Sequence, residues 1–172
     1  MSDWVLLLRA VNLGPRNKVA MADLRAILTD LGHGDVRTVL NSGNATFTGR
    51  KRSAKVLATE VEKALHRELD LDVRACVRSA DQIAAAVDGV PGDLTGYLAV
   101  TVLFDKPTPA ALKEVLERDW SPEVVRGNDQ VLYLSFSPGG VHSSKLQNAT
   151  LEKLLGVSCT ARTPATLRKL IT

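Results

Sequence analysis

Two clusters of hydrogen-bonding residues stand near the start of the chain, in places where a loop normally needs only turn residues. The first cluster is Asn12–Lys18, and the second is Asn41–Asn44, which reads Asn-Ser-Gly-Asn. Arg and Lys side chains suit contacts with phosphate or carboxylate groups, and Asn and Ser add neutral hydrogen-bond donors. If the fold brings the two clusters together, they form a site for a small anion.

The candidate ligand-binding residues come from both clusters, from the segment before the first one, and from two basic positions near the C-terminus. Backbone N–H groups around Gly14 and at the start of the next helix add donors, because a helix N-terminus favours an anion. The full set is Arg9, Asn12, Asn17, Lys18, Asn41, Ser42, Asn44, Lys145 and Arg162, with Arg16 as a further cation. The alternative is that the asparagines only satisfy loop and turn backbone.

A third polar segment, Ser137–Lys145, leads into an expected helix. Gly139-Gly140 permits close backbone approach, and Ser143, Ser144 and Lys145 stand at the expected helix start. The simpler interpretation is that one of the serines caps the helix. His142 has no Asp or Glu nearby in sequence to orient it, so the segment assigns no catalytic residue.

Several specific functions lack their motifs. Gly14 and Lys18 do not have the spacing of a nucleotide-binding P-loop, and no GxGxxG fingerprint is present. The three histidines stand apart from one another and from Cys76 and Cys159, so we expect no metal site and no cofactor. The aromatic residues do not form the pattern of an RNA-binding sheet face.

The composition is that of a globular protein, with 45% hydrophobic and 24% charged residues in 172. No apolar run approaches a membrane span, and the two cysteines, which lie far apart and match no paired spacing, favour the cytoplasm. Charge is uneven: residues 1–80 hold 13 Lys and Arg against 9 Asp and Glu, residues 81–141 hold 4 against 9, and residues 142–172 hold 5 against 1. Two basic ends favour an anionic partner, although a solvated surface explains them too.

The pattern of elements predicts two similar halves. The first half is predicted to run strand Trp4–Val11, a helix from Met21 closed by Gly32, strand Asp35–Leu40, returning strand Ala45–Thr48, a helix capped by Ser53, strand Val73–Arg78, and a short helix capped by Ser79. The second half is predicted to run strand Tyr97–Phe104, a helix capped by Thr108, hairpin strands Glu123–Arg126 and Gln130–Phe136, helix Ser143–Leu155, strand Val157–Ala161 and helix Thr163–Leu170.

The order βαββαβ predicts an α+β fold of two tandem ferredoxin-like subdomains with antiparallel sheets. We expect subdomain 1 with a trailing helix over 1–89, a linker over 90–96 and subdomain 2 over 97–172. In such a unit the loop after the first strand lies at the same sheet end as the hairpin. The two polar clusters are therefore expected to meet.

Several separated blocks resemble one bacterial family, catalogued as domain of unknown function 1697. They are Leu7–Gly14, Asn17–Met21, Leu24-Arg25, Asp35–Thr38, Asn41–Asn44, Ser144–Leu146, Asn148, Leu151-Glu152, Leu155-Gly156, Thr160, Arg162 and Thr166. The resemblance implies two tandem ferredoxin-like subdomains and supplies no activity. The chain departs from the family at Ala10, Pro15 and Ala20, and near Thr163-Pro164, where an Asn and a Trp are usual.

Three function classes remain open at this point. The preferred hypothesis is a cytoplasmic module that binds a small anionic, phosphate-bearing ligand at the two polar clusters. The second is a nucleic-acid or protein interaction module that uses the basic ends. The third is a hydrolase or transferase, for which the sequence names no catalytic residue.

Overall fold

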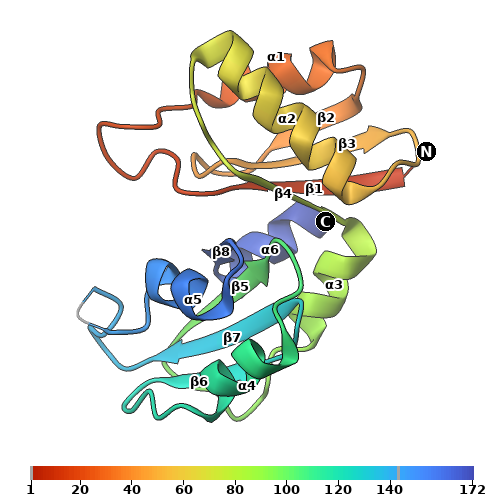
Figure 1. Ribbon diagram of the computed structural model, residues 1–172. Helices are drawn as coiled ribbons and strands as arrows, with labels where there is room; N and C mark the ends of the chain where they lie inside the picture. The colour runs from red at the N-terminus through yellow and green to blue at the C-terminus, as the bar shows by residue number, and fades with distance from the viewer. Residues whose placement is uncertain (1, 143) are drawn as a thin grey trace. The chain divides into compact units, whose positions relative to one another are not determined.

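The computed structural model describes residues 2–142 and 144–172. Within these residues the chain is an α+β protein with two four-stranded antiparallel sheets (Figure 1). The chain divides into two compact units, Met1–Ala84 with Arg168–Thr172, and Ala85–Leu167.

The division between the units falls inside helix α3 (Ala80–Asp88), whereas the sequence analysis placed a linker at 90–96. A hydrogen bond joins the second half of this helix to a strand of unit 2. The Tyr133 hydroxyl donates to the Ala86 carbonyl at 2.7 Å. Gly89 packs against the same hydroxyl, since a Cβ there would lie 2.6 Å from it.

Unit 1 has the strand order β2-β3-β1-β4. Its elements are β1 (Ser2–Leu8), α1 (Met21–Asp30), β2 (Gly34–Thr38), β3 (Asn44–Gly49), α2 (Ala54–Leu69), β4 (Ala75–Ser79) and the first half of α3. Helices α1 and α2 lie on one face of the sheet in Figure 1. The predicted elements of this half are all present, with ends shifted by a few residues.

The near-continuous apolar run of β1 gives a strand that is buried on both faces. Trp4, Leu6 and Leu8 belong to the core beneath α1 and α2. Val5 and Leu7 point to the other face and are equally buried. Because β1 pairs with both β3 and β4, its C-terminal end fixes where the next loop starts.

Helix starts follow the predicted capping residues. The Ser53 and Thr108 side chains each accept an N–H bond at 3.2 Å, from Val56 and Ala111 respectively. Ser79 and Gln82 cap α3 reciprocally, side chain to backbone in both directions. Local residue types therefore set these boundaries.

Unit 2 repeats the arrangement with the strand order β6-β7-β5-β8. Its elements are β5 (Tyr97–Leu103), α4 (Pro109–Glu117), β6 (Val124–Gly127), β7 (Val131–Phe136), α5 (Asn148–Leu155), β8 (Cys159–Arg162) and α6 (Pro164–Ile171), whose end belongs to unit 1. Leu103, Val115, Leu132 and Leu151 lie in the core of this unit.

One helix prediction was wrong at its start. Helix α5 begins at Asn148, whereas the sequence analysis began it at Ser143, a residue outside the described ones. The Ser144 hydroxyl accepts the Leu146 N–H at 3.0 Å, and Leu146 is buried in the core. The segment before α5 is therefore irregular because its side chains satisfy its own backbone.

Three further observations concern residues 2–142 and 144–172. No helix there is long and apolar enough to cross a membrane. No three His, Cys, Asp or Glu side chains gather there as a metal-binding group. Cys76 and Cys159 are both buried, and neither forms a disulfide bond with a described residue.

Candidate functional site

The two polar clusters meet at one end of the sheet of unit 1. We call this surface the loop platform and define it as residues 9–20, which connect β1 to α1, and residues 39–43, which connect β2 to β3. The Asn12 amide donates to the Asn41 carbonyl at 3.0 Å and to the Asn41 Oδ1 at 3.3 Å. These bonds join the connections as the strand order predicts.

Asn12 also closes the longer connection on itself. Its side chain donates to the Val19 carbonyl at 2.8 Å and accepts the Val19 N–H at 2.9 Å. Its backbone N–H donates to the Asn17 carbonyl at 3.1 Å. With these bonds made, the Asn12 side chain holds the loop and is not left to bind a ligand. This fits the interpretation that an asparagine satisfies loop backbone.

The turn of the hairpin places one predicted site residue inside the protein. Asn44 has an exposed fraction of 0%, and its amide donates to the Val39 carbonyl at 3.1 Å. Next to it, Gly43 has φ +74, and a Cβ there would lie 2.7 Å from atoms of Leu8 and Val11. Asn44 therefore supports the turn, while Asn41 is exposed and Ser42 is half-buried.

The cations of the loop platform differ in their surroundings. Arg16 and Lys18 are exposed, and neither side chain has a hydrogen bond or ion pair within the described residues. Arg9 is half-buried, and its backbone N–H donates to the Arg74 carbonyl at 3.0 Å. No acidic residue occurs in either connection, so the platform carries local positive charge.

Backbone strain gathers in the same two connections. Non-glycine residues with positive φ there are Ala10 (54°), Asn12 (55°), Asn17 (52°) and Leu40 (60°). Such conformations cost energy and persist only where surrounding contacts hold them. Surrounding contacts therefore fix the backbone of the loop platform. A Cβ added at Gly14 would meet no atom within 4 Å.

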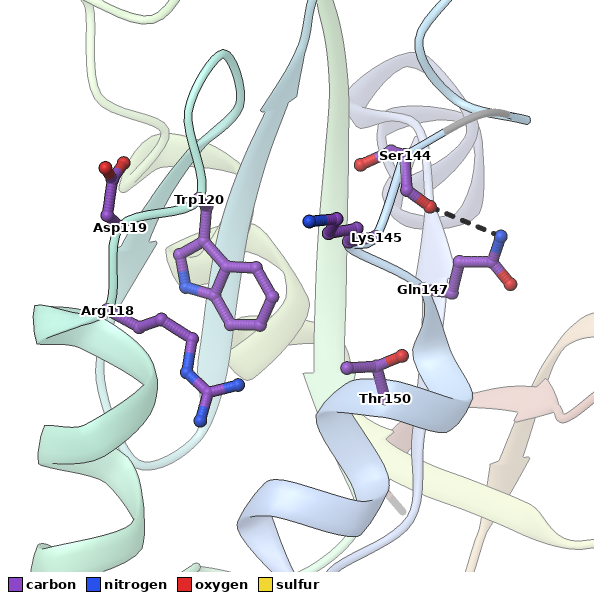
Figure 2. Close-up of a pocket in the computed structure, with 7 residues that line it drawn as sticks. All are labelled: Arg118, Asp119, Trp120, Ser144, Lys145, Gln147 and Thr150. Carbon is purple, nitrogen blue, oxygen red and sulfur yellow. Dashed lines mark hydrogen bonds between the residues drawn. The ribbon is translucent and has the colours of Figure 1, made fainter.

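Unit 2 carries a separate pocket with a volume of about 590 Å³. It lies between the connection from α4 to β6 and the segment that leads into α5 (Figure 2). Its lining residues are Arg118, Asp119, Trp120, Ser144, Lys145, Gln147 and Thr150. One predicted site residue, Lys145, is among them. The volume falls in the range of small-molecule sites.

One wall of the pocket is aromatic. The Trp120 Nε1–H donates to the Val115 carbonyl at 2.8 Å, and the indole packs against the core of unit 2. The Arg118 guanidinium lies over the ring, 5.5 Å from its centroid, and pairs with Glu114 at 2.7 Å. These contacts hold the ring in one orientation.

The acid beside this wall is turned away from the pocket. Asp119 accepts from the Ser121 hydroxyl at 2.6 Å and from the Ser121 N–H at 2.9 Å, and these bonds lower the pKa of its carboxyl. Figure 2 shows its carboxylate pointing away from the centre of the pocket. The negative charge of Asp119 is therefore held by its own turn.

The facing wall presents Lys145. Figure 2 shows its ammonium pointing across the pocket toward Trp120. It is exposed and has no hydrogen bond or ion pair within the described residues. Leu146 is 2% exposed and anchors the backbone next to it.

A buried carboxylate ties the two walls together. Glu123 is 8% exposed and follows the Trp120 turn, and its Oε2 accepts the Ser137 N–H at 2.8 Å. Gly140 packs closely over Glu123, since a Cβ there would lie 2.8 Å from its Oε1. The pocket therefore rests on a hydrogen bond between its two connecting segments.

The comparison with family models decides the family. The model described as "Protein of unknown function (DUF1697)" matches residues 1–133. The chain belongs to this family. The match confirms the suspected resemblance. It includes the loop platform and Trp120, and it ends before Lys145.

A solved structure resembles this DUF1697 protein along its length. It is the conserved bacterial protein SP0830 from Streptococcus pneumoniae, with 22% sequence identity and a TM-score of 0.75. The similarity covers 98% of this chain and 96% of the other. No curated protein matches the chain. At this identity the likeness concerns the fold.

The last predicted residue of this DUF1697 protein lies in unit 2, within β8. The Arg162 guanidinium donates to the Thr160 hydroxyl at 2.6 Å and to the Ala161 carbonyl at 2.9 Å. It does not line the pocket that contains Lys145. The structure thus places the two C-terminal candidates in different surroundings.

Sequence reasoning missed the aromatic wall of the pocket. Trp120 follows Arg118-Asp119 at the end of a predicted helix, and the available signal was a tryptophan placed in a connection between two predicted elements. The pairing of its connection with the segment before α5 depends on strand order. The same topological argument that joined the two polar clusters would have joined these two segments.

Proposed function

We propose that the loop platform of this DUF1697 protein binds a small anionic ligand that carries a phosphate group. The proposal rests on two exposed cations, Arg16 and Lys18, that have no partner among the described residues and stand on a loop held by Asn12. A held loop lowers the entropy cost of binding. Asn17, Asn41, Ser42 and Arg9 supply further donors around these cations.

Binding is favoured over catalysis at this surface. Residues 9–20 and 39–43 contain no His, Cys, Asp or Glu, so the platform itself offers no general base and no acidic metal ligand. We therefore keep hydrolase or transferase activity as an alternative without named residues.

A second candidate function is the docking of a protein or nucleic acid. The observation in favour is that Leu13 and Leu40 are 82% and 54% exposed, each next in sequence to one of the two bonded asparagines. Exposed apolar side chains beside cations suit an acidic protein segment better than a free phosphate. The basic surface suits a polyanion.

Calorimetric titration separates these functions. The probes are pyrophosphate, glucose 6-phosphate and a single-stranded RNA, each at low and at high salt. We expect saturable binding of a small phosphate compound, weakened about ten- to a hundred-fold by Lys18→Ala because a charge-assisted contact is lost. Lys63→Ala, an exposed lysine on α2, is the matched control and should bind normally.

The opposing results are equally definite. Binding of RNA alone, with a steep salt dependence, favours the nucleic-acid module. Equal losses in Lys18→Ala and Lys63→Ala, or no binding of any small phosphate compound, contradict the proposal.

Three finer assignments are also proposed. We infer that each unit is a ferredoxin-like βαββαβ unit, so that the two form a tandem repeat. The element order and the strand orders β2-β3-β1-β4 and β6-β7-β5-β8 support this. The two buried cysteines, which form no disulfide bond with a described residue, support a cytoplasmic location. The bacterial relative supports a bacterial origin.

A further inference from the structure

We propose that the pocket of unit 2 is a second binding site, for a ligand that joins a flat aromatic ring to an anionic group, as a mononucleotide does. This site is separate from the loop platform in both residues and chemistry. It rests on the geometry around Trp120 and Lys145 and does not depend on the function proposed for unit 1.

Trp120 suits the aromatic half of the ligand. Its Nε1–H is already bonded to the Val115 carbonyl, so the ring contributes a face and no free donor. Stacking on an aromatic face suits any flat heterocycle. The Arg118 guanidinium, which pairs with Glu114, lies over the ring and helps to hold it in one orientation.

Lys145 suits the anionic half of the ligand. Its ammonium points across the pocket toward Trp120 and has no partner within the described residues. The acidic residue of the lining, Asp119, accepts hydrogen bonds from Ser121 and points away from the pocket. A ligand that stacks on the indole therefore meets an unneutralised cation on the opposite wall.

The start of α5 supports the same end of the ligand. Its N-cap residue, Gln147, makes no side-chain cap, and its first turn contains no acidic residue. The positive end of the helix dipole is thus left without a negative side chain. The hydroxyls of Ser144 and Thr150 lie in the same lining and suit phosphate oxygens.

The test is titration with adenosine 5′-monophosphate, adenosine and inorganic phosphate, followed by calorimetry and by the NMR signal of the Trp120 indole N–H. We expect the monophosphate to bind more tightly than adenosine or phosphate alone and to move the indole signal. Lys145→Ala should weaken the monophosphate about tenfold and leave adenosine unchanged. Lys153→Ala, an exposed lysine on α5, should have no effect.

Trp120→Leu should weaken both the monophosphate and adenosine, and Trp120→Phe should retain most of the binding because it keeps a ring. If Trp120→Leu unfolds the protein, Trp120→Phe still shows whether an aromatic ring at this position is needed for binding. The proposal is overturned if the indole signal stays fixed, if Lys145→Ala and Lys153→Ala behave alike, or if only long RNA binds. Lys18→Ala should leave this binding intact, so failure here and failure at the loop platform are separate results.

Discussion

The two units share one strand order but place their long connections at opposite ends of the sheet. In unit 1 the long connection follows β1 and meets the β2–β3 hairpin, which gives the loop platform. In unit 2 the corresponding connections are 104–108 and 128–130. The longest connection of this unit, 137–147, follows β7 and, together with 118–123 before β6, encloses the pocket. In each unit the candidate site therefore contains the longest connection, and the two longest connections lie at opposite ends of the same strand order.

The two surfaces also differ in what holds them. The loop platform is held by polar contacts of Asn12, and its leucines point to solvent. The pocket is held by Leu146 in the core and by the buried Glu123. A rigid, basic surface follows in the first case, and a concave, partly aromatic surface in the second.

The largest expected effect sharpens the contrast between a buried and an exposed leucine. Leu146→Ala should lower the free energy of unfolding by about 2–5 kcal/mol, because it leaves a cavity beside the pocket. Leu13→Ala, in the loop platform, should change it by less than about 0.5 kcal/mol. Urea denaturation measures both. Similar values for the two variants would remove the contrast.

The second effect compares two glycines of the loop platform. Gly43→Ala should cost about 2–4 kcal/mol of unfolding free energy, since its Cβ would clash with Leu8 and Val11 at a positive φ. Gly14→Ala meets open space and should be nearly neutral. A neutral Gly43→Ala in the same denaturation assay would show that the hairpin turn is looser than described.

The third effect tests how strongly the Asn12 side chain holds the connection from β1 to α1. Asn12→Ala should cost about 1–3 kcal/mol, because the backbone groups of Val19 lose their partners. In Asn41→Ala the backbone carbonyl still accepts from Asn12, so the loss should be under about 0.5 kcal/mol. Hydrogen exchange of the Val19 amide distinguishes the variants. Unchanged protection of the Val19 amide in Asn12→Ala would contradict this role of Asn12.

The smallest effect concerns pH and is confined to unit 1. Burial lowers the pKa of His33, the Arg52 charge lowers it further, and Glu60 opposes both. On acidification the unfolded chain binds a proton at His33 at about pH 6.5, and the folded chain binds it only at a lower pH. The free energy of unfolding is therefore highest above that pH and falls as the solution is acidified. Urea denaturation from about pH 7.5 to about pH 5.5 should show this loss. His33→Gln should flatten the slope, and an unchanged slope would contradict the assignment.

Prediction from sequence worked where one residue type has one local task. Ser53 and Thr108 cap their helices as their positions indicate. The Asn-Ser-Gly-Asn turn produced a hairpin, and strand order then brought the two polar clusters together. These successes concern the backbone, which short-range patterns largely determine.

The individual roles of the side chains were harder to predict. Asn44 and Asn41 are the same residue type in the same turn, yet one is buried and the other is exposed. Ser144 looked like a helix cap, but it bonds Leu146 and leaves the helix to start later. Burial and three-dimensional neighbours decide such cases, and a linear pattern contains neither.

NMR titration of the labelled protein with pyrophosphate tests most directly whether an anion binds the loop platform of unit 1. We expect the amide signals of Gly14, Asn17, Lys18, Asn41 and Ser42 to move together and to saturate. In Lys18→Ala these changes should need about ten- to a hundred-fold more pyrophosphate, whereas Lys63→Ala should preserve them. Signals that stay fixed on the platform, or that move equally in both variants, would contradict anion binding there.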